Sequence, residues 1–195
     1  AVDDADVEGS ETIGLSLGNL TGPGASLGGQ STHTITITDD DTATIAFATA
    51  TSSLAEDGGS STVAVTLSLS VPGGGTITGA ETVQLSDAGT GTATSGIDYA
   101  TIANQTLTFA AGSSDGATRT VTVTGLADAL LEGDETIVLQ LSGVTGTGVS
   151  LGATTSHTAT ITDDESAALS FAGGAASIPE TGGSTTVTVA LSVSG

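Results

Sequence analysis

The sequence predicts an all-β protein built of antiparallel β-sandwich repeats. Thr, Ser, Gly, Ala and Val dominate the 195 residues, a composition that favours strands because helix formers such as Lys, Gln and Met are scarce. Seven stretches alternate apolar and hydroxyl-bearing residues, which is the period-two pattern of a half-buried strand. Seven such strands joined by Gly-rich turns indicate an immunoglobulin-like, seven-strand sandwich of two packed sheets.

The expected strands follow one another through the middle of the chain. The first is short and ends at Phe47. The other six are expected at 61–69, 81–85, 105–109, 119–124, 135–141 and 157–162. Gly-rich segments such as 72–75 and 143–152 are predicted to be turns between them.

An internal repeat divides the chain. The segment from Ala5 to Leu17 reappears from Ala129 to Leu141, and residues 1–71 match 125–195 without a gap at an offset of 124 residues. One period has the length of a whole β-sandwich. We therefore expect the C-terminal part of a preceding repeat at 1–42, a complete repeat at 43–165 and the N-terminal part of a following repeat at 166–195.

The charge of the chain is almost entirely of one sign. Lys and Arg together number 1 against 22 Asp and Glu, for a net charge of −21. This surface repels nucleic-acid phosphates and anionic membranes, no apolar run predicts membrane insertion, and metal cations are the favoured partners. Cys is absent, so no disulfide or thiolate site is expected. The single cation, Arg119, is expected to be solvent-exposed and of little consequence.

The carboxylates cluster at chain turns. Glu56 precedes the second strand, Asp128 and Glu132 lie between the fifth and sixth, and the acidic run 163–165 follows the seventh. If strand directions alternate, these turns meet at the pole that touches the next repeat. Like charges about 4 Å apart repel by roughly 1 kcal/mol in water, and a bound divalent cation reverses that sign. Calcium accepts about 6–8 oxygen ligands in a flexible geometry, whereas magnesium demands an octahedron. We expect calcium, with solvated acidic turns as the alternative.

Three stretches resemble the Calx-β domain family. Residues 91–99 read G-T-A-T-S-G-I-D-Y, similar to the family's G-T-A-x-x-G-x-D-Y, and residues 128–135 are similar to D-x-x-x-E-x-D-E. Residues 161–165, repeated at 37–41, are similar to the terminal I-x-D-D-D. The resemblance spans 43–165 and implies a seven-strand sandwich. Asp98 and Tyr99 also have a structural role available, with the tyrosine packed near a strand corner.

The resemblance also implies calcium ligands. In the complete repeat the matching positions are Glu56, Asp98, Asp128, Glu132, Asp163, Asp164 and Glu165. The candidates at matching positions of the flanking repeats are Asp4, Glu8, Asp39, Asp40, Asp41 and Glu180, and Asp3 is a further candidate. Ala127 and Ala129 stand where the family's richest sites have Asp, which implies fewer ions here; Asp3 occupies the position of Ala127 and implies a fuller site in the earlier copy.

The expected function is structural or adhesive. The chain is interpreted as calcium-binding repeats of an extracellular fibre, stalk or large adhesin of a bacterium, in which Ca²⁺ stiffens the repeat junctions. Its expected partners are neighbouring repeats, other copies in a filament and a surface or matrix ligand. The alternatives are a calcium-sensing regulatory module and a non-catalytic linker array in a secreted enzyme. No enzymatic activity is expected, because His33 and His157 are one repeat position and no nucleophile–base arrangement is evident.

Overall fold

The computed structural model describes residues 2–71 and 74–195, so Pro72 and Gly73 of the expected turn at 72–75 lie outside the described residues. The described elements are all strands: β1 (Glu11–Ser16), β2 (Thr32–Ile37), β3 (Thr42–Phe47), β4 (Thr51–Ala55), β5 (Ser60–Ser70), β6 (Glu81–Asp87), β7 (Gln105–Phe109), β8 (Thr118–Thr124), β9 (Glu135–Thr145), β10 (Val149–Leu151), β11 (Ser156–Thr162), β12 (Ser166–Phe171) and β13 (Val189–Ser194). This confirms the all-β prediction. Among these residues no helix has the length and apolarity that a membrane span requires.

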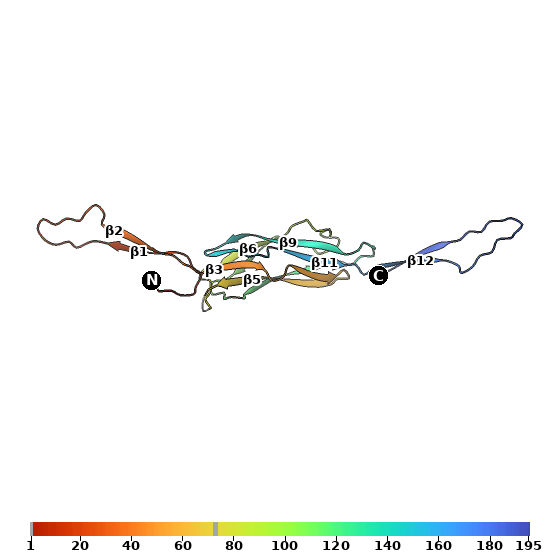
Figure 1. Ribbon diagram of the computed structural model, residues 1–195, viewed down its shortest axis with the longest axis horizontal. Coiled ribbons are helices and arrows are strands. Elements are labelled where there is room, and N and C mark those ends of the chain that lie inside the picture. The colour runs from red at the N-terminus through yellow and green to blue at the C-terminus, as the bar shows by residue number, and fades with distance from the viewer. Residues whose placement is uncertain (1, 72–73) are drawn as a thin grey trace.

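Strands β3 to β11 form a two-layer sandwich in the middle of an elongated chain (Figure 1). One sheet has the order β10-β3-β5-β8 and the other the order β4-β11-β9-β6-β7. The predicted sandwich is confirmed, with two strands that were not expected: β4, which pairs with β11, and β10, which pairs with β3, both in parallel. Strand β10 lies inside the segment 143–152 that was expected to be a turn; the glycines with positive φ, at 143, 146 and 148, all precede it.

Alternating residues of each strand form the core between the two sheets. Strand β5 buries Val63, Val65 and Leu67, while the residues between them are half-buried. The opposite sheet contributes Ile137 and Leu139 of β9, both at most 1% exposed. Burying each such side chain contributes about 1.5–3 kcal/mol, so the sandwich is held by apolar burial without disulfides.

Two hairpins extend from opposite ends of the sandwich, β1–β2 and β12–β13 (Figure 1). Their pairing reproduces that of the sandwich at the 124-residue offset. In β1–β2 Glu11 pairs with Ile37, and in the sandwich Glu135 pairs with Ile161. The register of β12–β13 likewise repeats that of β3–β5. The repeat seen in the sequence is therefore also a repeat of strand pairing.

Arg119 differs from the expectation of an exposed, inconsequential cation. Its side chain is half-buried, and its guanidinium lies 5.0 Å from the centre of the Phe109 ring. Nε donates a hydrogen bond to the Thr108 carbonyl at 2.6 Å, and Nη1 donates to the Thr118 carbonyl at 2.7 Å. Since β7 and β8 are edge strands of different sheets, Arg119 ties those edges together. The strand pattern could not reveal this neighbour from the other sheet.

Candidate metal site

Four chain turns meet at the end of the sandwich where β11 ends and the chain continues to β12. Glu56 follows β4, Asp98 lies between β6 and β7, and the β8–β9 turn carries Asp128 and Glu132. Asp163 follows β11 directly. Carboxylate oxygens from these turns lie within 4.8 Å of one another in two groups, one containing Glu56 and Asp163 and the other containing Asp98, Asp128 and Glu132. The expected meeting of the acidic turns at one pole is thus observed, and the β6–β7 connection joins them through Asp98.

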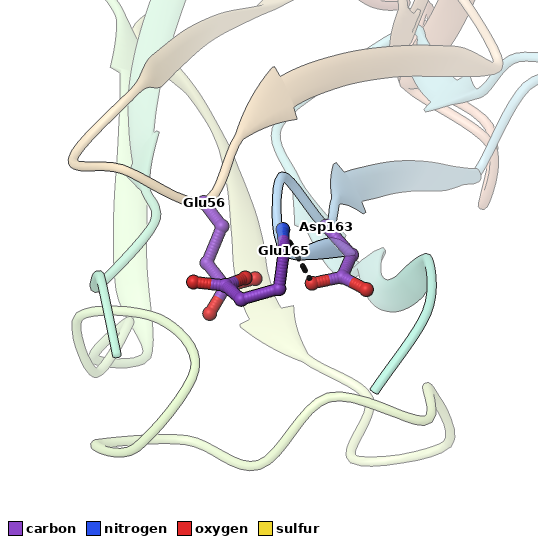
Figure 2. Close-up of side chains that lie close together, drawn as sticks. All are labelled: Glu56, Asp163 and Glu165. Atoms are coloured by element: carbon purple, nitrogen blue, oxygen red, sulfur yellow. Dashed lines mark hydrogen bonds between the residues drawn. The ribbon is translucent and has the colours of Figure 1, made fainter. Parts of the chain in front are cut away.

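Glu56, Asp163 and Glu165 form the first carboxylate triplet of this pole. One oxygen from each lies within 4.8 Å of the other two, and Glu56 is buried while its two partners are half-buried. Figure 2 shows the three side chains meeting between the turn after β4 and the turn after β11. Two oxygens bound to one calcium at about 2.3–2.6 Å lie at most about 5 Å apart. The spacing therefore fits a single ion.

Asp98, Asp128 and Glu132 form a second triplet with the same spacing. Asp98 is buried, and its Oδ2 accepts a hydrogen bond from the amide of Thr94 at 2.5 Å. The motif that presents Asp98 begins at Gly91, where a Cβ would lie 2.0 Å from the carbonyl oxygen of Thr136. Only glycine allows this approach to β9, which gives the first residue of the motif a physical role.

The β8–β9 turn is held in place by Asp163. Its Oδ2 accepts a hydrogen bond from the amide of Gly133 at 2.9 Å, and its Oδ1 accepts from the amide of Glu165 at 3.3 Å. A side-chain hydrogen bond between the two acids lowers the pKa of Asp163 and, together with burial, raises that of Glu165 to about 6. A cation bound between the two carboxyls would stabilise both in their charged form.

The charges of the two triplets act on each other. Burial raises the pKa of Glu56, and the charges of Asp128 and Asp163 raise it further. Burial also raises the pKa of Glu132, followed by the charges of Asp128 and Asp98. The pole is therefore one continuous field of negative charge, which a hard cation would neutralise.

Glu135 is the member of this site that sequence reasoning did not assign as a ligand. Burial, followed by a hydrogen bond with Asp98 and the charge of Asp98, raises its pKa to about 7. It stands at the end of the D-x-x-x-E-x-D-E motif and at the first residue of β9. Its position in that motif is the available signal, but the apolar residues that follow it favour a place in the strand.

Several expected ligands lie outside the two triplets. Asp164 is exposed, although its charge raises the pKa of Glu56 and Glu165. Glu180 is exposed in the connection between β12 and β13. The six carboxylates expected in the preceding copy line one cavity of about 360 Å³: Asp3, Asp4, Glu8, Asp39, Asp40 and Asp41. No triplet of the same spacing forms there within the described part of the chain, and residues 1–42 contain no counterpart of Glu56 or Asp98.

The donor set suits a hard divalent ion. Both triplets offer only carboxylate oxygens, the ligands that calcium prefers. The Oε2 atom of Glu165 is buried and has no hydrogen-bond partner among the described residues, an arrangement that is costly unless a ligand satisfies it. The two triplets therefore have room for one or two cations.

His157 does meet a serine, but inside the sandwich. Its Nε2 lies 2.9 Å from Oγ of Ser52, and its Nδ1 lies 2.8 Å from the carbonyl oxygen of Thr49. The imidazole is fully buried and its ring centre is 5.5 Å from that of Phe47. This environment satisfies a core histidine and offers a substrate no access to it.

Comparison with known proteins identifies the family model that fits this architecture. The Calx-beta domain model matches residues 38–165. The fold is similar to that of the apo-form Calx CBD1 domain, at 21% identity and a TM-score of 0.51 over 63% of this chain and 98% of that one. It is also similar to CBD12 from CALX1.2 and to the calcium binding domain CBD12 of CALX1.1, each at 23% identity, a TM-score of 0.51 and 62% of this chain. The matches span 44% and 45% of those two chains. No curated protein matches the sequence.

Proposed function

The chain belongs to the Calx-beta domain family, and on that premise we propose that it is a calcium-binding structural repeat of an extracellular fibre, stalk or large adhesin, in which bound calcium stiffens the junction between repeats. The observation that carries this proposal is the pair of carboxylate triplets at the pole from which β11 leaves the sandwich. A protein of similar fold, CBD12 of CALX1.1, is a calcium binding domain, which supports the proposal.

Each triplet has a defined part in binding. Glu56, Asp163 and Glu165 hold one ion, with the orphaned Oε2 of Glu165 as one of its donors. Asp98, Asp128 and Glu132 hold a second where both sites fill. Flexible coordination by carboxylates from separate turns suits calcium better than magnesium, which needs a near-ideal octahedron and retains its waters.

Stiffening follows from where the ligands lie along the chain. Strand β11 ends at Thr162 and β12 begins at Ser166, so the ligand-bearing segment 163–165 is itself the connection between repeats. An ion shared by Glu56 and Asp163 fixes this connection to the sandwich. Without the ion, the carboxylates repel one another over a screening distance of about 8 Å at physiological salt. Calcium removal therefore loosens the junction.

The cellular setting is inferred from the same properties. A net charge of −21 without Cys suits a secreted bacterial protein that relies on calcium rather than disulfides. The sealed position of His157 supports a non-catalytic role. Affinity separates this setting from a calcium sensor, because extracellular modules bind at about 10⁻⁴–10⁻³ M and cytosolic sensors at about 10⁻⁷–10⁻⁵ M.

The stiffening mechanism is tested by small-angle X-ray scattering on an extended chain, in which a second copy of residues 72–165 follows Gly195 and completes the next repeat. We expect a narrower distribution of dimensions with calcium than with a chelator, and loss of this difference in Glu56→Gln. Asp57→Asn, at an exposed neighbour outside both triplets, serves as the control. The same distribution with and without calcium would rule out stiffening even where calcium binds.

A further inference from the structure

Val7 is part of the core of the sandwich, although the 124-residue repeat assigns it to the preceding repeat. It lies in the turn before β1 and matches the β8–β9 turn of the complete repeat. Yet it is fully buried and forms a parallel bridge with Ile77, itself fully buried. The amide of Val7 donates to the Thr76 carbonyl at 2.9 Å, and the amide of Thr78 donates to the Val7 carbonyl at 3.1 Å. One repeat thus inserts a side chain into the next.

The receiving surface is shaped for this insertion. A Cβ at Gly75 would lie 1.3 Å from the carbonyl oxygen of Ala5, and one at Gly148 would lie 2.6 Å from Cγ1 of Val7. Both glycines therefore leave room that the preceding repeat fills. Asp6 adds polar contacts, since its Oδ1 accepts hydrogen bonds from the amide of Thr76 at 2.8 Å and from its hydroxyl at 3.0 Å.

The 124-residue offset identifies the matching residues of the complete repeat. Val7 corresponds to Leu131 and Asp6 to Leu130, which are 53% and 58% exposed. The two turns are held alike, because Asp39 accepts a hydrogen bond from the amide of Gly9 at 3.1 Å as Asp163 does from Gly133. The turn before β1 and the β8–β9 turn therefore match in sequence position and are held by the same kind of hydrogen bond. They differ because, in the part of the chain that the structure describes, only the turn before β1 has a sandwich packed against it.

We propose that Leu131 is the plug that joins the complete repeat to the repeat after it, inserting beside the copy of Ile77 in a second sandwich of this same kind. Among the described residues the side chain of Leu131 stays 53% exposed, as expected for a plug whose receiving sandwich is not in place. The occupant of the exposed leucine face is thus a sandwich of the same type as the one that receives Val7. Glu132, the next residue, belongs to the second carboxylate triplet, so one turn carries both the plug and a candidate metal ligand.

The plug does not rest on calcium. Leu131 would hold the next repeat through apolar burial and backbone pairing. A bound ion would instead immobilise the β8–β9 turn, which carries Leu131. Docking measured without calcium therefore tests the plug separately from the proposed function, and calcium binding to the 195-residue chain tests the proposed function without the plug.

Hydrogen exchange of the extended chain, in calcium-free buffer, tests the plug directly. We expect the amide of Leu131 to exchange about tenfold more slowly in the extended chain than in the 195-residue chain, and Leu131→Asp to abolish that difference. Leu130→Asp is the matched control: it restores the residue found at Asp6, so protection should persist. Because both leucines are exposed in the 195-residue chain, neither substitution should change its unfolding temperature.

A second arm uses the 195-residue chain itself. Gly75→Ala should accelerate exchange of the Val7 and Thr78 amides, because the added methyl meets Ala5. Gly79→Ala is the control, since its Cβ would make only an ordinary contact of 3.6 Å with Glu81. Equal exchange at Leu131 in the two chain lengths, or unchanged exchange at Val7 in Gly75→Ala, would overturn the proposal.

Discussion

Asp163 accepts a hydrogen bond from the backbone amide of Gly133 at 2.9 Å. This contact joins the turn after β11 to the turn between β8 and β9, so one side chain both positions a loop and offers an oxygen to the first triplet. Its depressed pKa, caused first by the hydrogen bond with Glu165, keeps it charged at neutral pH.

Asp163→Asn should therefore weaken calcium binding at least about tenfold, because it removes a charge from the triplet while keeping an oxygen that can accept from Gly133. Asp164→Asn is the matched control, since Asp164 is adjacent, exposed and outside both triplets. Calorimetric titration of both variants decides between them. An equal loss in Asp164→Asn would contradict the assignment of the triplet.

Glu132→Gln should weaken calcium binding more than Asp134→Asn. Glu132 belongs to the second triplet, whereas Asp134 is exposed, makes a long contact of 3.4 Å with the amide of Asp163, and is replaced by Ser10 in the preceding copy. Calcium titrations of the two variants under identical salt measure the difference. Equal effects would mean that the β8–β9 turn contributes only general negative charge.

The calcium-free chain should lose stability as the pH rises from about 5 to about 7.5. The pKa of Glu135 is raised to about 7, first by burial, and that of Glu165 to about 6, first by its hydrogen bond with Asp163. The folded chain thus holds these protons to a higher pH than the unfolded chain does, where both groups titrate near 4.5. Their stabilising contribution is complete below about pH 4.5 and disappears as the pH passes through 6 to 7.

Thermal unfolding at pH 5 and pH 7.5 measures this effect. Saturating calcium should raise the unfolding temperature more at pH 7.5, since binding there displaces fewer protons. Glu135→Gln should flatten the calcium-free pH dependence. A calcium-free unfolding temperature that is higher at pH 7.5 than at pH 5 would contradict the protonation scheme.

Arg119→Ala should lower the free energy of unfolding by about 1–2 kcal/mol, because it removes two hydrogen bonds to carbonyls and the contact with the Phe109 ring. Urea denaturation measures the change. The exposed neighbour Thr120 provides the control, with Thr120→Ala expected within about 0.5 kcal/mol of the parent chain. An unchanged free energy of unfolding in Arg119→Ala would contradict this role and agree with the expectation from sequence that Arg119 matters little.

The sandwich could be predicted from local patterns because period-two burial leaves a trace in each strand. The pairing of Ile45 with Leu67, both fully buried, follows from two such patterns on neighbouring strands. The placement of β3 and β4 in different sheets leaves no such trace, because both strands alternate normally. It is decided by β10 and β11, about a hundred residues away.

The acidic pole was predictable only in part for the same reason. Glu56, Asp128 and Glu132 stand at turns, so strand alternation alone brings them to one end. The selection of Glu165 over Asp164 depends on the conformation of a single turn, in which Asp163 accepts from the amide of Glu165. The burial of Val7 depends on contacts with the segment around Ile77, and no local pattern predicts those contacts. The repeat relates Val7 to Leu131, but it indicates a docking role for Leu131 only after the contacts of Val7 are known.

The central claim, calcium binding at this pole, is tested most directly by calorimetric titration of the 195-residue chain with calcium and, separately, with magnesium. We predict a heat of calcium binding at or below about millimolar concentration with one or two ions for the complete repeat, weaker binding of magnesium, a marked loss in Glu56→Gln and no change in Asp57→Asn. An absence of calcium binding at millimolar concentration would contradict the claim. Equal affinities for calcium and magnesium, together with equal calcium affinities of Glu56→Gln and Asp57→Asn, would also contradict it.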